Sequence, residues 1–302
     1  MSDSHTVGEY RRSVSRYLHP PHHDVVDVVR RSLTEDLTPL GDLTASLVPP
    51  GARATAAIVS RPGGTIAGTA CVAETVAQVD RELSLDWMVV EGEQVDARQV
   101  LGTIRGSLES ILIAERTCLN FLMYLSGIAT NTRRYVDAAT GSAQVWDTRK
   151  TTPGLRSLEK AAVRAGGARN HRGNLSDWIM LKDNHLMGVS IADGVAAAKE
   201  RWPARTVHVE ADRLEQVETA VHARADAILL DNMSAETLSE AVALVDSLAG
   251  DGPRPLLEAS GGIDLTTIEA ISHTGVDMIS TSNLSFGAPT LDIGLDIQAD
   301  AS

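Results

Sequence analysis

The chain has 302 residues, of which 43% are hydrophobic and 22% are charged, proportions typical of a globular protein with a substantial core. Its formal net charge of −13 argues against non-specific binding to nucleic acid or to anionic membranes through the whole surface, but leaves room for a local basic pocket. A polar N-terminus, no apolar run of about 18 residues and two widely spaced cysteines, Cys71 and Cys118, favour a cytoplasmic protein without signal peptide, membrane span or disulfide framework.

The first part of the chain, up to about residue 106, alternates short apolar runs with glycine- and proline-rich turns. Such runs, at 54–60, 65–70 and 86–106, predict antiparallel strands, and residues 71–83 have the spacing of a helix. We therefore expect an antiparallel α+β module in this part of the chain.

A long helix is predicted next, over residues 107–139, with Ser107 as its N-cap. It is apolar on nearly all sides from Thr117 to Leu125, which indicates a buried helix, and Gly127 is a candidate break in it. Arg116 is a polar intrusion, for which an ion pair with Glu or Asp is the alternative to a role in binding.

From residue 143 onward, apolar strands that end in polar residues alternate with helices. The predicted strands are 144–150, 178–184, 206–212, 226–232, 254–260 and 276–282. This alternation is typical of a parallel sheet covered by helices, and six strands in series favour an incomplete (β/α) barrel. No G-x-G-x-x-G follows the first strand, which disfavours a Rossmann fold. We place the domains at residues 1–126 and 127–302, and leave open that the C-terminal tail returns to the first domain.

Active sites of (β/α) barrels lie at the carboxyl ends of the strands. The residues at those ends are Arg149, Lys150, Lys182, Asp183, Glu210, Asp231, Ser260, Gly261, Gly262, Ser280, Thr281 and Ser282, and a glycine-rich loop adds His171 and Arg172. Early strands thus supply cations, middle strands carboxylates, and late strands glycine and hydroxyl groups.

Crowded cations repel one another unless an anion lies between them, so the pattern predicts a phosphorylated, carboxylated ligand. The late loops are suited to phosphate, and Glu210 and Asp231 to sugar hydroxyls or Mg²⁺. Taken singly, each residue has another interpretation: a strand-end Lys or Arg as a solvated charge, Glu210 and Asp231 as helix N-caps, His171 as structural.

Seven motifs together closely resemble the quinolinate phosphoribosyltransferases (decarboxylating), also called nicotinate-nucleotide pyrophosphorylases: "AERTCLNFLMYLSGIAT", "DTRKTTPGLR", "EKAAVRAGGARNHRGNLSDWIMLKDNHL", "VEAD", "LLDNM", "EASGGI" and "LDIGLD". The resemblance extends from about residue 35 to residue 297. It implies a pentosyltransferase of NAD biosynthesis that converts quinolinate and phosphoribosyl pyrophosphate, with Mg²⁺, to nicotinate mononucleotide, pyrophosphate and carbon dioxide. It also implies an N-terminal α/β sandwich domain followed by an incomplete α/β barrel, and a homodimer in which each barrel faces the partner's N-terminal domain.

The resemblance assigns a role to each matching position. The quinolinate carboxylates fall to Arg149, His171, Arg172 and Lys182, with Arg116 contributed by the partner subunit. Lys150 is expected to face phosphoribosyl pyrophosphate. Glu210 and Asp231 are expected to contact its ribose and the metal. Its 5′-phosphate is expected to bind to Ser260, Gly261 and Gly262.

One segment departs from the family pattern. "STSNLSFG", residues 280–287, has Ser282 and Asn283 where the family has glycine, and Ser285-Phe286-Gly287 where it has a Thr-His-Ser-like triplet. We expect Ser282 to bind phosphate, but a paralogue acting on another pyridine or azole acid stays an alternative. A second alternative is a Schiff-base barrel aldolase that uses Lys150 or Lys182, and a third is a binding protein without turnover.

Overall fold

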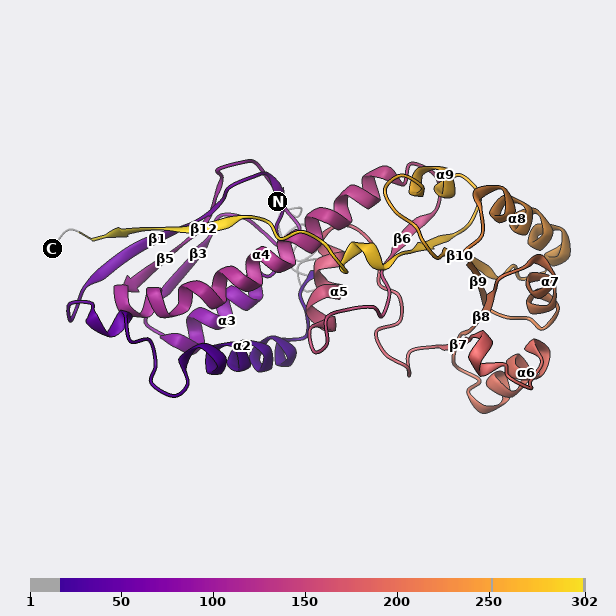
Figure 1. Ribbon diagram of the computed structural model, residues 1–302, viewed down its shortest axis with the longest axis horizontal. Helices are drawn as coiled ribbons and strands as arrows, with labels where there is room; N and C mark the ends of the chain where they lie inside the picture. The colour runs from indigo at the N-terminus through magenta and orange to yellow at the C-terminus, as the bar shows by residue number, and fades with distance from the viewer. Residues whose placement is uncertain (1–16, 251, 301–302) are drawn as a thin grey trace, which may run out of the picture. The chain divides into compact units, whose positions relative to one another are not determined.

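A computed structural model describes residues 17–250 and 252–300 of the chain (Figure 1). The first 16 residues, on which the expectation of no signal peptide rests, lie outside the described residues. The described chain divides into two compact units. Unit 1 comprises residues 17–133, 152–167 and 287–300, and unit 2 comprises 134–151 and 168–286. The predicted boundary after residue 126 stays a prediction.

Unit 1 contains an antiparallel sheet in the order β12-β1-β5-β3 (Figure 1). Its strands are β1 (Arg53–Ser60), β3 (Ser84–Trp87), β5 (Val100–Ser107) and β12 (Ile293–Ala299), and a separate pair joins β2 (Gly64–Thr65) to β4 (Gln94–Val95). The C-terminal strand β12 thus pairs with the first strand of the unit, Ala54 opposite Ala299 and Ser60 opposite Ile293.

Helices α3 (Thr69–Val79) and α4 (Leu108–Ala138), the latter mostly in unit 1, pack on this sheet (Figure 1). The other helices of the unit are α2 (His22–Leu37), the 3₁₀ helix η1 (Ala45–Leu47) and α5 (Arg156–Ala165). Ile58, Leu101 and Ile104 of the sheet and Val72 and Leu122 of the helices are fully buried in one cluster. These observations confirm the predicted α/β sandwich.

The run at 65–70, predicted as a strand, is instead the end of a short strand, a three-residue connection and the start of a helix. The strand ends at Thr65, and α3 begins at Thr69. The reason is a capping interaction that is distant in sequence. The buried carboxylate of Glu91 accepts hydrogen bonds from the backbone N–H groups of Gly68 (2.8 Å) and Thr69 (3.1 Å), the first donors of the helix.

Helix α4 begins where the sequence predicts, but it is not broken at Gly127. The backbone N–H of Ser110 donates to the Ser107 hydroxyl (3.3 Å), which confirms the N-cap, and the helix continues through Gly127. The glycine instead allows a close approach of backbone. A Cβ built there would lie 2.8 Å from the Cα of Thr290 and 3.1 Å from the nitrogen of Leu291, which donates to the carbonyl of Met123.

Of the described helices, α4 alone has the length and apolar composition that could cross a membrane. However, 61% of its most apolar 18-residue window is buried inside the protein, among the core residues of unit 1. The composition of α4 therefore reflects its position as a core helix.

Unit 2 is built on a six-stranded parallel sheet in the order β6-β11-β10-β9-β8-β7 (Figure 1). Its strands are β6 (Gln144–Trp146), β7 (Ile179–Leu181), β8 (Val207–Ala211), β9 (Ala227–Asp231), β10 (Leu256–Ser260) and β11 (Met278–Ser280). Its other helices are η2 (Asp183–His185), α6 (Ile191–Arg201), α7 (Leu214–His222), α8 (Ala235–Ala249), α9 (Ile268–Ser272) and η3 (Ser282–Leu284).

This strand order confirms the incomplete barrel. Neighbours in the chain are neighbours in the sheet from β7 to β11, and the last strand pairs with the first. The sheet is open only between β6 and β7, its two edges in the described chain. The connection between those two strands supplies α5, which belongs to unit 1. The barrel is therefore open between β6 and β7, where the connecting helix α5 belongs to unit 1 and does not cover the sheet of unit 2.

Replacing Gly127 tests the close approach at α4. Alanine has the higher helix propensity, by about 1 kcal/mol, so propensity alone predicts that Gly127→Ala stabilises unit 1. We expect the opposite, a loss of about 1–3 kcal/mol, because the methyl group would overlap the backbone at 289–291. Urea unfolding measures the difference.

Gly194→Ala in α6 is the matched control. Its added methyl group would contact only the flexible ends of Leu186 (3.1 Å) and Leu181 (3.2 Å), so we expect unfolding within about 0.5 kcal/mol of wild type. Equal stability of the Gly127→Ala variant and wild type would contradict the packing argument.

Candidate active site

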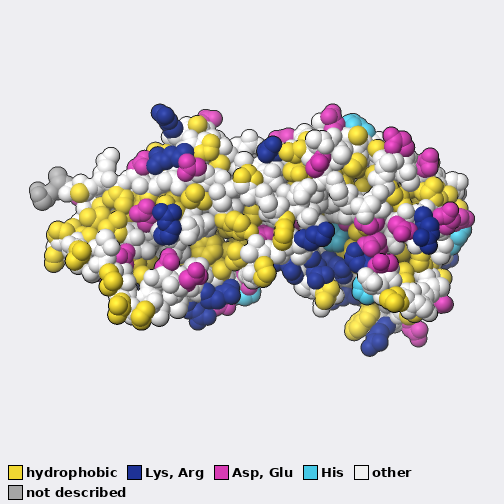
Figure 2. All heavy atoms as spheres, viewed as in Figure 1, with side chains coloured by type: hydrophobic (Ala, Val, Ile, Leu, Met, Phe, Trp, Pro, Cys, Tyr) yellow, Lys and Arg dark blue, Asp and Glu magenta, His cyan; other side chains and the backbone are white. Residues whose placement is uncertain are grey.

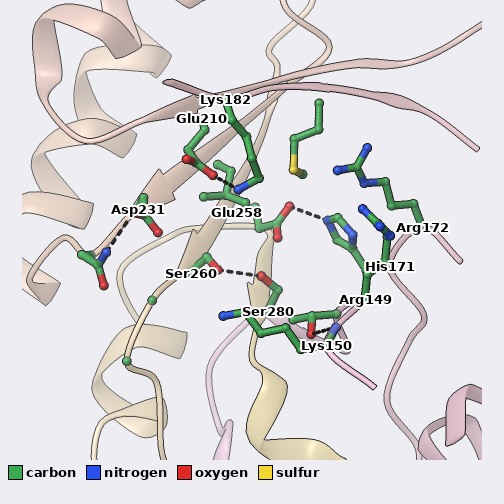
Figure 3. Close-up of a pocket in the computed structure, with 16 residues that line it drawn as sticks. Arg149, Lys150, His171, Arg172, Lys182, Glu210, Asp231, Glu258, Ser260 and Ser280 are labelled. Carbon is green, nitrogen blue, oxygen red and sulfur yellow. Dashed lines mark hydrogen bonds and ion pairs between the residues drawn. The ribbon is translucent and has the colours of Figure 1, made fainter. Parts of the chain in front are cut away.

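The carboxyl ends of the parallel strands surround a cavity of about 620 Å³ in unit 2 (Figure 3). Its charged lining residues are Arg149, Lys150, His171, Arg172, Lys182, Glu210, Asp231 and Glu258, and Ser260, Gly261, Gly262 and Ser280 also line it. Figure 2 shows Lys and Arg side chains gathered on this unit beside Asp and Glu side chains. The structure therefore brings together nearly all the residues that the sequence placed at strand ends.

The strand register explains why these side chains share one face. Leu181 pairs with Val209, which sets Lys182 beside Glu210, and Ser260 pairs with both Asp231 and Ser280. Side chains at equivalent positions of neighbouring parallel strands point to the same side of a sheet. A pocket at this edge follows directly from the pairing.

Positive charge is concentrated on one wall of the cavity. Burial, together with the nearby charge of Arg149, lowers the pKa of the Arg172 guanidinium from its usual value. The guanidinium donates to the backbone carbonyl of Trp178 (3.3 Å). Lys182, a further cation of this lining, forms an ion pair with Glu210 (Figure 3). The amine of Lys182 is thus in contact with a carboxylate of the neighbouring strand.

The loop that carries His171 and Arg172 is fixed by Asp147, a residue to which the sequence analysis assigned no role. Asp147 is 2% exposed at the end of β6. Its two carboxylate oxygens accept hydrogen bonds from the backbone N–H of His171 (2.7 Å) and from the side-chain amide of Asn170 (2.7 Å). The backbone of the loop is therefore anchored to the sheet.

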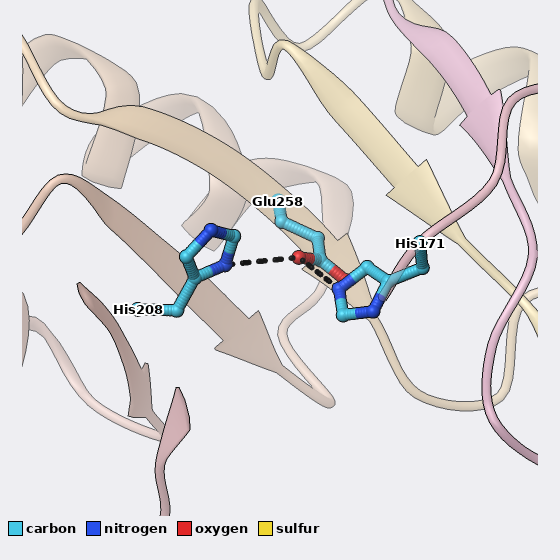
Figure 4. A group of neighbouring side chains, drawn as sticks. All are labelled: His171, His208 and Glu258. Atoms are coloured by element: carbon cyan, nitrogen blue, oxygen red, sulfur yellow. Dashed lines mark hydrogen bonds and ion pairs between the residues drawn. The ribbon is translucent and has the colours of Figure 1, made fainter. Parts of the chain in front are cut away.

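His171, His208 and Glu258 form a buried cluster, of which His171 and Glu258 line the cavity (Figure 4). A Glu258 carboxylate oxygen lies 3.1 Å from Nε2 of His171 and 3.8 Å from Nδ1 of His208. Burial lowers the pKa of His208 to about 4. Burial also acts to raise the pKa of Glu258, but the hydrogen bond and charge of His171 outweigh it, and the net shift is downward.

Sequence reasoning missed His208 and Glu258 because both lie within apolar strands. A usable signal was present: each precedes a predicted site residue, Glu210 or Ser260, by two positions. Alternate residues of a strand face the same side, so both had to point toward the pocket.

The glycine loop after β10 has an unusual backbone. Gly261 and Gly262 have φ values of +97° and +62°, a region that favours glycine, and a Cβ on Gly261 would lie 2.9 Å from the backbone nitrogen of Asn232. The Thr281 hydroxyl (2.9 Å) and the Asn283 amide (3.0 Å) both donate to the carbonyl of Ile263 at the end of this loop.

The segment that departs from the family pattern therefore fastens one loop to another. Glycine at position 283 could not provide this bond. Ser282, expected to bind phosphate, begins η3 and is not among the residues that line the cavity.

Two groups of side chains could hold a cation. Glu210 and Asp231 offer carboxylate oxygens from adjacent strands, the hard ligands that Mg²⁺ prefers. Neither caps a helix: α7 begins at Leu214, and α8 is capped by Ser234. His171, His208 and Glu258 have ligand atoms within 4.8 Å of one another, but in this group the closest pair already forms a hydrogen bond.

Arg116 lies on α4 in unit 1. Its side chain is exposed rather than buried, and within the described part of the chain no ion pair joins it to a carboxylate. The alternative interpretation of Arg116 as half of a buried ion pair is therefore wrong.

Known proteins resemble this chain over almost its whole length. Residues 42–126 match the family described as quinolinate phosphoribosyl transferase, N-terminal domain, and residues 128–296 match quinolinate phosphoribosyl transferase, C-terminal domain. A nicotinate-nucleotide pyrophosphorylase (carboxylating) from Mycobacterium leprae is 40% identical, over 90% of this chain and 96% of that protein. The solved structure of the nicotinate-nucleotide pyrophosphorylase from Francisella tularensis is 36% identical with a TM-score of 0.89, over 93% of this chain and 99% of that one.

Proposed function

Because this chain belongs to the quinolinate phosphoribosyltransferase family, we propose that the cavity of unit 2 is where it carries out the reaction of that family. The protein is a pentosyltransferase that transfers the phosphoribosyl group of phosphoribosyl pyrophosphate to quinolinate, for NAD biosynthesis. The observation that supports the location is the wall of cations facing carboxylates and a glycine loop at one sheet edge.

Quinolinate is a dicarboxylate, and the cationic wall is complementary to it. Arg149, His171, Arg172 and Lys182 bind its carboxylates in our proposal, and the paired oxygens of a carboxylate suit the fork of a guanidinium. The buried position of Arg172 strengthens this contact, because charges attract more strongly where water is excluded.

The other residues that line the cavity suit the phosphoribosyl donor. Lys150 faces its pyrophosphate, and the loop of Ser260, Gly261 and Gly262 binds its 5′-phosphate through backbone N–H groups. Glu210 and Asp231 would hold Mg²⁺, which would supply positive charge beside the pyrophosphate. We assign no phosphate contact to Ser282.

The reaction then follows from orientation and electrostatics. The pyridine nitrogen of quinolinate attacks C1 of the ribose while the bond to pyrophosphate breaks, and positive charge develops on the sugar. The carboxylates of Asp231 and Glu210 stabilise that positive charge, and Lys150 stabilises the departing pyrophosphate. The 2-carboxylate departs as carbon dioxide, its electron pair stabilised at C2 by the adjacent pyridinium nitrogen, and a proton takes its place.

We propose that the protein acts as a homodimer in which Arg116 reaches the partner's cavity. The exposed position of Arg116 on α4, without a carboxylate partner in the described chain, supports this role. We also propose a cytoplasmic location, since Cys71 and Cys118 are both free and buried. Some plant relatives are named as chloroplastic or mitochondrial proteins.

The product assay tests the function directly. Protein incubated with quinolinate, phosphoribosyl pyrophosphate and Mg²⁺ should release nicotinate mononucleotide, pyrophosphate and carbon dioxide in equal amounts, and chelation of Mg²⁺ should stop the reaction. Nicotinate or an azole acid in place of quinolinate tests for a paralogue. Product formed only from such an acid would refute the assignment of quinolinate.

Arg149→Ala and Lys182→Ala each remove one charge that contacts the acceptor in our proposal. We expect kcat/KM to fall about 100- to 1000-fold, as when one preorganised donor is removed from an active site, with unchanged circular dichroism. Lys199→Ala is the matched control, because Lys199 pairs with Asp226 on the surface of the same unit (3.0 Å). Near-normal turnover in both pocket variants would contradict the site.

Mixing two inactive variants tests the shared site. Arg116→Ala and Lys182→Ala should each be inactive alone. After unfolding and refolding together, half of the dimers are mixed and each holds one intact site, so activity should return to about a quarter of wild type. No recovery, with mixed dimers shown by native mass spectrometry, would exclude Arg116 from the partner's site.

A further inference from the structure

We propose that Glu258 is a positioning residue that holds the ring of His171 in the orientation that binds quinolinate. This inference rests on the proposed function of the cavity, because it concerns a residue behind the acceptor site. Glu258 lies on β10, between the neighbouring strands β9 and β11, and His171 lies in the loop anchored by Asp147. The backbone of His171 is thus fixed by one carboxylate and its ring by another (Figure 4).

The burial of Glu258 needs an explanation that packing does not supply. Its side chain is 0% exposed, and the Ser280 hydroxyl is the one other polar side chain besides the two histidines whose interaction lowers the pKa of the carboxyl, while Oε1 makes no hydrogen bond of good geometry among the described residues. A buried carboxylate with an unsatisfied oxygen is destabilising, whereas an apolar residue of similar size would be tolerated in a strand interior. Such groups in a native structure point to a functional reason.

The contacts around Glu258 identify His171 as the group on which it acts. His171 is its shortest ionisable contact, at 3.1 Å, and both line the cavity. His208 is 3.8 Å away and is not among the lining residues, and its low pKa keeps it neutral near pH 7. The charge of Glu258 also acts on Arg172, and Arg172 in turn is close enough to Arg149 for the two positive charges to repel.

An ionised carboxylate can only accept hydrogen bonds, so the proton in the Glu258–His171 bond belongs to Nε2 of His171. This bond fixes which ring nitrogen faces the sheet and prevents the ring from turning over. Trp178 restrains the ring from another side, in an edge-on contact with a centroid distance of 4.8 Å. The ring is therefore oriented before quinolinate arrives, which reduces the entropy lost on binding.

Kinetics of two variants test this role. Glu258→Leu removes the acceptor, and we expect kcat/KM for quinolinate to fall about 10- to 100-fold, while KM for phosphoribosyl pyrophosphate stays unchanged. Glu258→Gln keeps an oxygen that accepts from Nε2–H, so it should retain most of the activity lost in the leucine variant. Equal loss for both substrates would indicate a general structural role and overturn the proposal.

A double-mutant cycle separates action through His171 from independent effects. In a His171→Gln background, Glu258→Leu should cause no further loss in kcat/KM for quinolinate, because the ring that it orients is absent. Additive losses would overturn the proposal. Glu91→Gln is the matched control: Glu91 is a buried glutamate that caps α3 in unit 1, and its substitution should lower the melting temperature without changing KM for quinolinate.

One measurement on the wild-type protein does not depend on how the Glu258 variants fold. Nitrogen-15 NMR should show a proton bound to Nε2 of His171 and protected from solvent exchange, with His171→Gln used for assignment. A rapidly exchanging or absent Nε2 proton would overturn the proposal. If wild-type protein instead forms no nicotinate mononucleotide, the proposed function fails, while the NMR signal still decides whether Glu258 holds the ring.

Discussion

The repulsion among cations at the edge of the parallel sheet is the constraint on which the site depends. Arg149, Lys150, Arg172 and Lys182 line one cavity, and Arg172 is largely buried. Such a set is stable only when negative charge is placed to offset it. Part of that charge is permanent, in Glu210, Asp231 and Glu258, and the remainder is provided by the two anionic substrates.

The carboxylates of unit 2 divide into two kinds by their exposure. Asp147 and Glu258 are buried: Asp147 forms a hydrogen bond with the backbone of His171, and Glu258 forms one with its ring. Glu210 and Asp231 are partly exposed at the ends of β8 and β9 and face the cavity. Rigid support behind the cavity and adaptable groups facing it are what a site for two charged substrates requires.

Each of the two units is built from segments that are not contiguous in the sequence. Helix α5 and strand β12 are encoded after the first barrel strand, yet both belong to unit 1. Gly127 allows the returning C-terminal segment to cross α4 before β12 pairs with β1. A fold of this kind needs its C-terminus to complete the sheet of its N-terminal unit, because β12 covers one edge of β1.

The sequence by itself determined the parallel sheet, the incomplete barrel and most of the pocket residues, because apolar runs with polar ends alternate with helices as in a parallel sheet. Arg149, Lys182, Glu210 and Asp231 were visible at those ends. Tertiary structure alone decided the cap that Glu91 places on α3, the role of Gly127, the exposed position of Arg116 and the support of His171 by Glu258. In each of the contacts made by Glu91, Gly127 and Glu258, the partners are 22 or more residues apart along the chain, so no local pattern could bring them together.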